Sequence, residues 1–296
     1  MHVFPDFQPL DVELDGVRVR GRLGPSTGRP PLLLLHGHPE THVMWHRVAP
    51  QLARQFDVVL PDLRGYGRSG RPAPGPDHAA YSKRTMARDA VELMAALGHE
   101  RFAVVGHDRG ARVAARLAGD HPDRVSAAML LDVAPTLDMY EATDRAFASA
   151  YWHWFFLIQP APMPEALAGA NPRGYVEGVM GARHAGLAPF PPEVLDEYVA
   201  GFDGAERAAG AAHDYRAANG IDLEHDRADR AAGRRIEVPL RVLWARHGVI
   251  ERLFDPLALW GRIADEVSGH AVDCGHYLPE EAPDEIVREI REFLGA

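Results

Sequence analysis

The stretch AVVGHDRGARVAARLAG, residues 103–119, is the clearest indicator of the fold. An apolar run ends in Gly-His-Asp-Arg-Gly, and a helix-like pattern follows it. Glycines on both sides of a central residue, at a turn from strand to helix, are typical of a nucleophile elbow. Gly106 and Gly110 would permit the tight bend, and Asp108 would project from it into a cleft. A carboxylate nucleophile suits displacement at a saturated carbon, which gives an ester with the enzyme.

Short apolar runs alternate with helix-length stretches on both sides of this segment. The runs are residues 32–35, 58–60, 102–105, 127–131 and 240–244, and the helical stretches are 44–54, 82–97, 111–121 and 283–294. Compact apolar runs are typical of strands buried on both faces, so the pattern predicts a parallel sheet covered by helices. Residues 12–23, polar around a central Gly16, predict an antiparallel hairpin at the sheet edge.

The alternation stops between about residues 137 and 235, where the periodicity is helical and the sequence contains YWHWFF. We interpret this stretch as a helical cap inserted after the fifth or sixth strand. The predicted organisation is therefore a core formed by residues 1–136 and 236–296, with a cap formed by residues 137–235.

Composition limits the classes of partner. The chain has 296 residues, 46% of them hydrophobic and 25% charged, which is enough for a large core. A net charge of −10 argues against nucleic acid and anionic membranes as partners. The single cysteine, Cys274, excludes an internal disulfide, and no segment resembles a signal peptide or a membrane span. We expect a cytoplasmic protein, and association into a homodimer stays open.

Hydrolysis of an ester at Asp108 requires a base that activates water. His276, in DCGHYLPEEAPDEI just before the last helical stretch, is the candidate base, because its loop can return to the elbow. Asp132, which ends the run MLLDVAPT, is the favoured orienting acid. Asp255 and Glu251, which follow the next strand, are the alternatives.

An oxyanion formed during hydrolysis needs backbone donors. We expect them to be the N–H groups of Arg109, after the nucleophile, and of His38 in LLLLHGHPET. The other histidines, His42, His46 and His107 among them, are interpreted as packing or surface groups without metal-ligand spacing. No glycine loop has the spacing of a phosphate-binding fingerprint, so we expect no cofactor and no metal.

The motifs HGHPETHVMWHRVAP, DLRGYGRS, GHDRGARVA, LDVAPT, YWHWFF, HDYRA and CGHY together resemble the haloacetate dehalogenases of the α/β-hydrolase fold, in particular fluoroacetate dehalogenases. The resemblance covers about residues 5–295 and implies a mostly parallel eight-stranded sheet. It implies that Arg109 and Arg112 hold the substrate carboxylate. Three residues apart at a helix start, they can form a fork at the positive end of the helix. It also implies a halide pocket of His153, Trp154 and Tyr215.

This sequence departs from the family pattern at two places. Family members usually carry an aromatic residue where His38 stands, and a further pocket tryptophan near Ala182, where this chain reads GVMGARHAG. Both departures predict a wider or more polar pocket that accepts larger 2-haloacids.

Two other functions fit parts of the pattern. Soluble epoxide hydrolases share His-Gly-x-Pro-Glu and Gly-His-Asp-x-Gly, and they protonate the epoxide oxygen with cap tyrosines. Tyr215 would be one such tyrosine, and Tyr140, Tyr151, Tyr175 or Tyr198 the second. A non-catalytic receptor of the same fold is the third hypothesis, and the intact Asp-His-Asp set argues against it. The favoured partner is a small 2-haloacid substrate.

Overall fold

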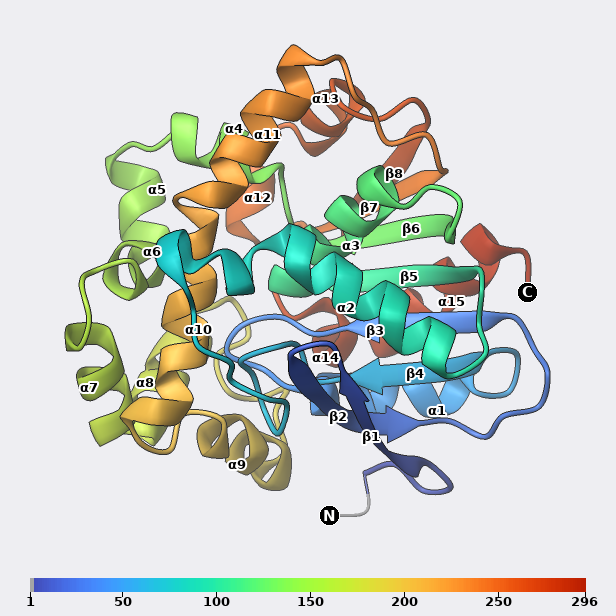
Figure 1. Cartoon of the computed structure of the whole chain (residues 1–296), viewed down its shortest axis with the longest axis horizontal. Helices are drawn as coiled ribbons and strands as arrows, with labels where there is room; N and C mark the ends of the chain where they lie inside the picture. The colour runs from blue at the N-terminus through green and yellow to red at the C-terminus, as the bar shows by residue number, and fades with distance from the viewer. Residues whose placement is uncertain (1–2) are drawn as a thin grey trace.

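The computed structural model describes residues 3–296, and these form an eight-stranded sheet with helices on both faces (Figure 1). The strands are β1 (Gln8–Leu14), β2 (Val17–Leu23), β3 (Pro31–Leu35), β4 (Asp57–Pro61), β5 (Phe102–His107), β6 (Val125–Leu131), β7 (Leu240–Ala245) and β8 (Val267–Val272). Their order in the sheet is β1-β2-β4-β3-β5-β6-β7-β8. β2 runs antiparallel to β1 and β4, and the remaining neighbours are parallel. The predicted fold class is confirmed.

The central strands carry the core. Every residue of β4 and β5 is buried, as both faces of these strands are covered. All five predicted strands and the hairpin are present. The sequence reading named no strand at β8, whose residues VSGHAV alternate between partly buried and exposed. An edge strand with one solvated face lacks the continuous apolar run that marks the others.

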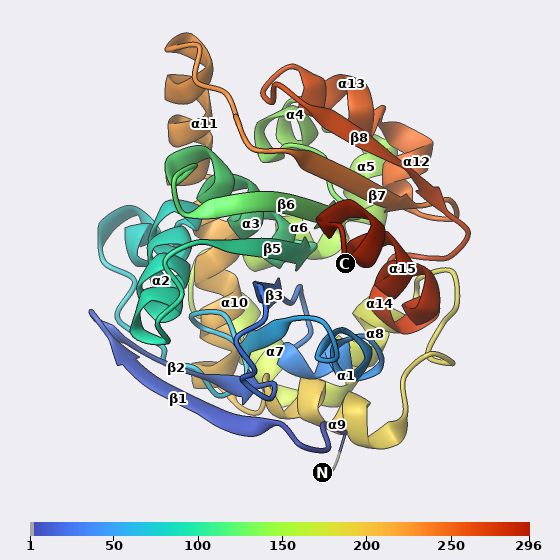
Figure 2. The ribbon, with the colours of Figure 1, turned by 90° about the vertical axis from the view of Figure 1, so that its right-hand side faces the viewer.

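Helices of the core lie on both sides of the sheet. They are the 3₁₀ helices η1 (His42–Arg47) and η2 (Pro76–Tyr81), and α1 (Ala49–Leu52), α2 (Lys83–Ala96), α3 (Arg109–Asp120), α12 (Val249–Leu253), α13 (Pro256–Gly261), α14 (Leu278–Glu281) and α15 (Pro283–Leu294). α2 and α3 cover one face, and α1, α14 and α15 cover the other (Figure 2). The single helix predicted for residues 44–54 is wrong: it is divided into η1 and α1, because Pro50 has no N–H to continue a helix.

The polypeptide leaves the sheet after β6 and returns at β7 through a series of helices. These are α4 (Thr136–Glu141), α5 (Arg145–Ala150), α6 (Trp152–Leu157), α7 (Met163–Ala170), α8 (Pro172–Gly181), α9 (Pro192–Ala200), α10 (Ala205–Ala218) and α11 (Ile221–Ala231). Most of them lie beyond the carboxyl ends of the parallel strands, on the left in Figure 1. The insertion follows the sixth strand, one of the two predicted positions.

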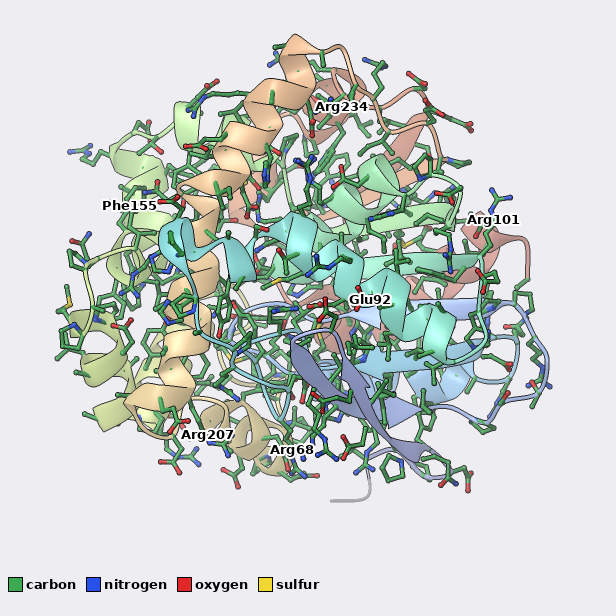
Figure 3. The ribbon with its side chains drawn as sticks, viewed as in Figure 1. Arg68, Glu92, Arg101, Phe155, Arg207 and Arg234 are labelled. Atoms are coloured by element: carbon green, nitrogen blue, oxygen red, sulfur yellow. The ribbon has the colours of Figure 1, made fainter. Side chains whose placement is uncertain are left out.

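Charged side chains extend around the periphery, for example Arg101 and Arg207 in Figure 3. No helix among residues 3–296 is long and apolar enough to cross a membrane. The residues predicted to react lie instead where β3, β5, β6 and β8 end, beneath the cap helices. In open α/β sheets this edge is where ligands bind.

Candidate active site

Asp108 occupies a strained turn between β5 and α3. Its backbone has φ 46° and ψ −110°, a conformation that side-chain-bearing residues rarely adopt. A Cβ atom on Gly106 would lie 2.3 Å from the carbonyl oxygen of Gly110, and one on Gly110 would lie 2.5 Å from that of Leu35. The turn therefore exists only because both positions are glycine, as the elbow motif predicted.

His276 and Asp132 meet although 144 positions separate them. His276 Nδ1 lies 2.6 Å from Asp132 Oδ2, and Asp132 Oδ1 accepts a hydrogen bond of 2.9 Å from the Ala245 N–H. The alternative acids have other partners: Asp255 accepts from the Ala258 N–H at the start of α13, and Glu251 accepts from a tryptophan N–H. Asp132 is thus the carboxylate that orients His276.

Electrostatics keep Asp108 ionised. Burial alone would raise the pKa of this carboxyl, but the neighbouring basic side chains of His276, His107, Arg112 and Arg109 hold it well below its usual range. The side chain is 3% exposed. A charged carboxylate in such a site is a nucleophile that needs no base to remove a proton.

His38 contributes the first predicted oxyanion donor. Its backbone N–H donates to Asp108 Oδ1 over 3.1 Å. Its imidazole stacks on His153 at 5.7 Å between ring centroids, and a 3.0 Å hydrogen bond links its Nε2 to the Tyr175 hydroxyl. Burial lowers the pKa of His38 to about 3, so the ring is neutral. The Arg109 N–H stays a predicted second donor.

Arg109 is held from behind by Asp214. Its Nε donates to Asp214 Oδ2 over 2.8 Å and its Nη2 to Oδ1 over 2.7 Å. Asp214 also accepts from Lys83 and, at 2.7 Å, from the Tyr66 hydroxyl. Arg109 Nη1 is buried and has no hydrogen-bond partner among residues 3–296. The guanidinium is therefore fixed in place with one N–H group to spare.

Arg112 lies one helical turn further along α3. Its Nη1 donates to the Ala134 carbonyl over 3.1 Å and to Thr136 Oγ1 over 2.8 Å. Its Nε is buried and lacks a partner within the described part of the chain. Each arginine of the predicted fork thus has an unused donor.

The cap brings His153, Trp154 and Tyr215 onto this fork from α6 and α10. Tyr215 lies 5.9 Å from His153 and 6.1 Å from Trp154, measured between ring centroids. The Arg109 guanidinium lies 4.2 Å from the Tyr215 ring, and that of Arg112 lies 4.8 Å from the Trp154 ring. Trp154 Nε1 and the Tyr215 hydroxyl are buried and find no partner in residues 3–296.

Protonation states suit these three cap residues to hydrogen-bond donation. Burial lowers the pKa of His153 well below its usual value, and the neighbouring positive charge of Arg183 lowers it further. Burial raises the pKa of Tyr215 well above its usual value. His153 is therefore a neutral imidazole and Tyr215 a protonated phenol, and Trp154 carries an N–H in every state.

The chain is similar to proteins of known family. The model of the alpha/beta hydrolase fold matches residues 30–283. The chain belongs to the α/β-hydrolase family. It is 43% identical to a fluoroacetate dehalogenase from Burkholderia sp over 99% of this chain and 95% of that protein. It is 32% identical to a soluble epoxide hydrolase from Corynebacterium sp. (strain C12), over 89% of this chain and 90% of the relative.

A solved structure agrees with the fold. The crystal structure of a Nostoc sp PCC 7120 protein assigned to the α/β hydrolases superposes with a TM-score of 0.92 at 50% identity, covering 98% of both chains. The family and the dehalogenase relative support a hydrolase.

Sequence reasoning missed two parts of this α/β hydrolase's site. His107 is not merely a packing group: its Nδ1 lies 2.9 Å from Glu40 Oε2, and its Nε2 lies 2.8 Å from the His276 carbonyl oxygen. Burial would lower the pKa of His107, but Glu40 raises it to about 9, so the protonated ring donates to both. Asp214 was the second omission, and its place beside Tyr215 in HDYRA was the available signal.

Two other histidines match the packing interpretation. His42 is buried and lies 2.8 Å from Asp62, and His46 is partly buried against its own helix. Residues 3–296 contain no group of three or more His, Cys, Asp or Glu side chains arranged to hold a metal ion.

Proposed function

We propose that this α/β hydrolase is a haloacetate dehalogenase, which converts a short 2-haloacid such as fluoroacetate and water into the 2-hydroxyacid and halide. One observation carries the proposal. Four buried donors without partners lie on side chains that contact one another beside a charged nucleophile: Arg109 Nη1, Arg112 Nε, Trp154 Nε1 and the Tyr215 hydroxyl.

Unpaired buried donors are unfavourable in the free enzyme. Each costs about 1–3 kcal/mol, and more when the group is charged. An anionic substrate relieves that cost: a carboxylate accepts from Arg109 and Arg112, and a halogen accepts from the cap residues. A neutral substrate would leave both guanidinium donors unsatisfied.

In the first step an Asp108 carboxylate oxygen bonds to carbon 2 of the haloacid as the carbon–halogen bond breaks. The halide leaves with the bonding electron pair. Hydrogen bonds from His153, Trp154 and Tyr215 stabilise the charge that develops on it, which matters most for fluoride. The product of this step is an Asp108 ester.

In the second step His276 takes a proton from water, which attacks the carbonyl carbon of the Asp108 ester. Asp132 stabilises the resulting imidazolium through its 2.6 Å contact with Nδ1. The His38 N–H, already 3.1 Å from Asp108 Oδ1, donates to the oxyanion. As the oxyanion collapses, the bond from the ester oxygen to the Asp108 carbonyl carbon breaks, and the His276 imidazolium gives its proton to the departing alkoxide, which leaves as the 2-hydroxyacid. The Asp108 carboxyl group then loses its remaining proton to solvent, which restores the carboxylate.

Epoxide hydrolysis is the second candidate, supported by the Corynebacterium relative. Two of the tyrosines that could assist Tyr215 already have hydrogen-bond partners: Tyr175 is hydrogen-bonded to His38, and Tyr198 to Glu280. Tyr140 has a buried hydroxyl with no partner among the described residues. Tyr140 is therefore the strongest candidate for the second proton donor in that reaction.

Product analysis separates the two reactions. Purified protein is incubated with fluoroacetate, chloroacetate and, separately, styrene oxide; halide is measured by electrode and ion chromatography, and glycolate and diol by mass spectrometry. We expect halide and glycolate in equal amounts. Diol formation without halide release would establish the epoxide hydrolase instead, and no turnover of any substrate would favour the receptor.

A further inference from the structure

A third arginine, Arg183, comes from the cap and not from α3. It belongs to the cap loop between α8 and α9, and its guanidinium carbon lies 5.1 Å from the centroid of the Tyr151 ring. Tyr151 is 2% exposed, and its ring lies 5.8 Å from His153 in the predicted halide pocket. Arg183 therefore approaches the reaction centre from the cap.

The loop that carries Arg183 packs against the loop that carries His276. A Cβ atom on Gly275 would lie 2.9 Å from the Cβ of His184, so the two loops are in close contact. The position of Arg183 is thus set by the catalytic loop as well as by the cap.

The Arg183 guanidinium has neither a hydrogen bond nor an ion pair with any residue in the part of the chain that the structure describes, although it is partly buried. Burial lowers the pKa of Arg183, and the Tyr151 and Tyr277 hydroxyls raise it by more. The carboxylates of Asp132 and Asp108 add to the increase. The side chain is a fixed positive charge within electrostatic range of the catalytic carboxylates.

Stacking on Tyr151 accounts for only part of this placement. A cation over an aromatic ring gains about 0.5–2 kcal/mol, but the contact uses a face of the guanidinium. The five N–H groups lie in its plane and match a carboxylate in a two-point contact. Stacking on Tyr151 therefore leaves them free for a ligand.

Tyr151 also connects Arg183 to the fork. Burial has the largest effect on the pKa of Tyr151 and raises it, whereas the charges of Arg183 and Arg112 both lower it. Cations therefore come from two elements, Arg109 and Arg112 from α3 and Arg183 from the cap, and all three lie within electrostatic range of Asp108.

We propose that Arg183 binds a second carboxylate, so that the preferred substrates are 2-halodicarboxylic acids such as 2-chlorosuccinate. The proposal rests on the dehalogenase function and specifies its substrate class. One carboxylate occupies the α3 fork and the other pairs with Arg183. Asp108 bonds to carbon 2 as chloride leaves, and water activated by His276 hydrolyses the ester. The overall products are 2-hydroxysuccinate, chloride and one proton.

The test compares 2-chlorosuccinate with 2-chlorobutyrate, which has the same chain length and one carboxylate fewer. We expect the native enzyme to have the higher kcat/KM for 2-chlorosuccinate. In Arg183→Gln the ratio of the two kcat/KM values should fall about ten- to a hundredfold, the effect of losing one charge-assisted contact. Arg183→Lys should retain part of the preference, because it keeps the charge without the planar pair of donors.

Arg173→Gln is the matched control. Arg173 is an exposed arginine of the cap helix α8 that pairs with Glu177 and Asp196, so its loss should leave the ratio unchanged. Calorimetric titration of unreactive succinate and butyrate provides a second measurement. Succinate should bind the native protein more tightly, and Arg183→Gln should remove the difference.

Two results overturn the inference alone: halide release from chloroacetate without preference for 2-chlorosuccinate, or an Arg183→Gln variant that loses activity toward 2-chlorosuccinate and 2-chlorobutyrate by the same factor. Absence of chloride release from chloroacetate and 2-chlorosuccinate alike overturns the proposed dehalogenase function, and the inference with it.

Discussion

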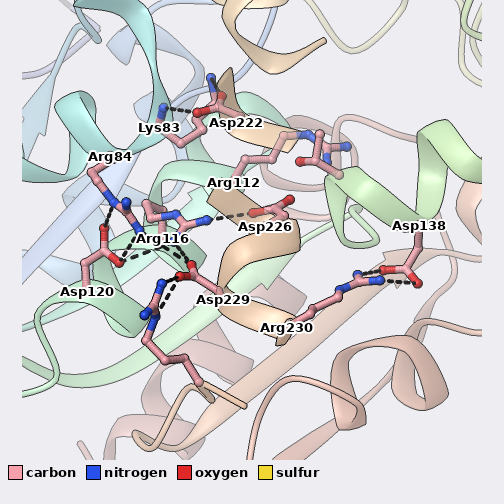
Figure 4. Close-up of polar contacts among 12 residues, drawn as sticks. Lys83, Arg84, Arg112, Arg116, Asp120, Asp138, Asp222, Asp226, Asp229 and Arg230 are labelled. Atoms are coloured by element: carbon pink, nitrogen blue, oxygen red, sulfur yellow. Dashed lines mark hydrogen bonds and ion pairs between the residues drawn. The ribbon is translucent and has the colours of Figure 1, made fainter. Parts of the chain in front are cut away.

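Arginines on the same helix have opposite roles in this molecule. Arg116, on α3, forms ion pairs with three carboxylates: Asp120 at 3.3 Å, Asp226 at 2.6 Å, and Asp229 (Figure 4). Arg112, one turn earlier, has no ion pair with a carboxylate of residues 3–296 and keeps an unpaired Nε. Arg116 joins the core to the cap helix α11, whereas Arg112 keeps a donor that the proposed substrate carboxylate can use.

The contrast extends to their ionisation. Burial lowers the pKa of Arg116, but the carboxylates around it, Asp229 first, raise it by more. For Arg112 burial and the charge of Arg109 both lower the pKa. An arginine whose donors are satisfied stabilises the structure, whereas one with a buried donor to spare has binding capacity that the protein itself does not use.

Replacing Asp108, the proposed nucleophile, should have the largest effect, because both steps of the proposed reaction take place on its carboxyl group. We expect Asp108→Asn to lower halide release by about 10⁴-fold or more, since an amide does not displace halide. Turnover at the native rate, in protein shown by mass spectrometry to retain the amide, would falsify the assignment.

His276→Asn should impair only the second step, and the steady-state rate should fall by about 10²–10⁴-fold. Alkylation of Asp108 needs no base, so we expect a burst of at most one halide per active site. With fluoroacetate the Asp108 peptide should gain a carboxymethyl group, measured by mass spectrometry.

An isotope experiment checks the same division in the native enzyme. A single turnover in heavy-oxygen water should label Asp108 and leave the first glycolate unlabelled. Label appearing directly in glycolate, with no adduct in His276→Asn, means that water displaces the halide.

Arg112→Leu tests the binding half of the comparison. We expect kcat/KM for chloroacetate to fall about ten- to a hundredfold, mainly through KM, because a charge-assisted contact of about 1.5–3 kcal/mol is lost. Unchanged steady-state kinetics would leave Arg112 without a role in binding.

Arg116→Leu tests the structural half. Loss of the shared cation leaves three carboxylates without it, and we expect the free energy of unfolding to fall by about 1–3 kcal/mol, measured by urea denaturation. The kcat/KM of the folded enzyme should not change. A tenfold loss of kcat/KM with native stability would contradict the distinction between the two arginines.

Asp222, beside the same cluster, should give the smallest effect and a dependence on pH. Burial raises its pKa to about 6, and its Oδ1 accepts from the Lys83 N–H over 2.9 Å. Folded protein therefore binds more protons than unfolded protein between about pH 4 and 6, so this group lowers stability as pH rises through that window.

Asp222→Asn should remove that loss. We expect the Tm difference between the variant and the native protein to be a few degrees larger at pH 8 than at pH 4. This corresponds to a change in the free energy of unfolding on the order of 1 kcal/mol. The measurement is calorimetry at both pH values. An equal Tm difference at pH 4 and pH 8 would show that folding does not shift the pKa of Asp222.

Local sequence patterns were sufficient to predict the sheet strands with continuous apolar runs, the insertion of helices before β7, and the elbow. These features depend on neighbours within a few residues: the glycines at positions 106 and 110 fix the turn, and the run that precedes them fixes the buried strand. Local spacing encodes local geometry, so the sequence alone predicts roles for Asp108 and His276.

Contacts between side chains that are distant in sequence follow from the tertiary structure alone. Asp132 rather than Asp255 reaches His276 because the order of β6, β7 and β8 places their ends side by side, across 144 positions of sequence. The Arg109–Asp214 pair spans 105 positions and depends on how the cap docks on α3. The contact between the loop that carries Arg183 and the loop that carries His276 has the same cause, because packing brings together residues that no local pattern connects.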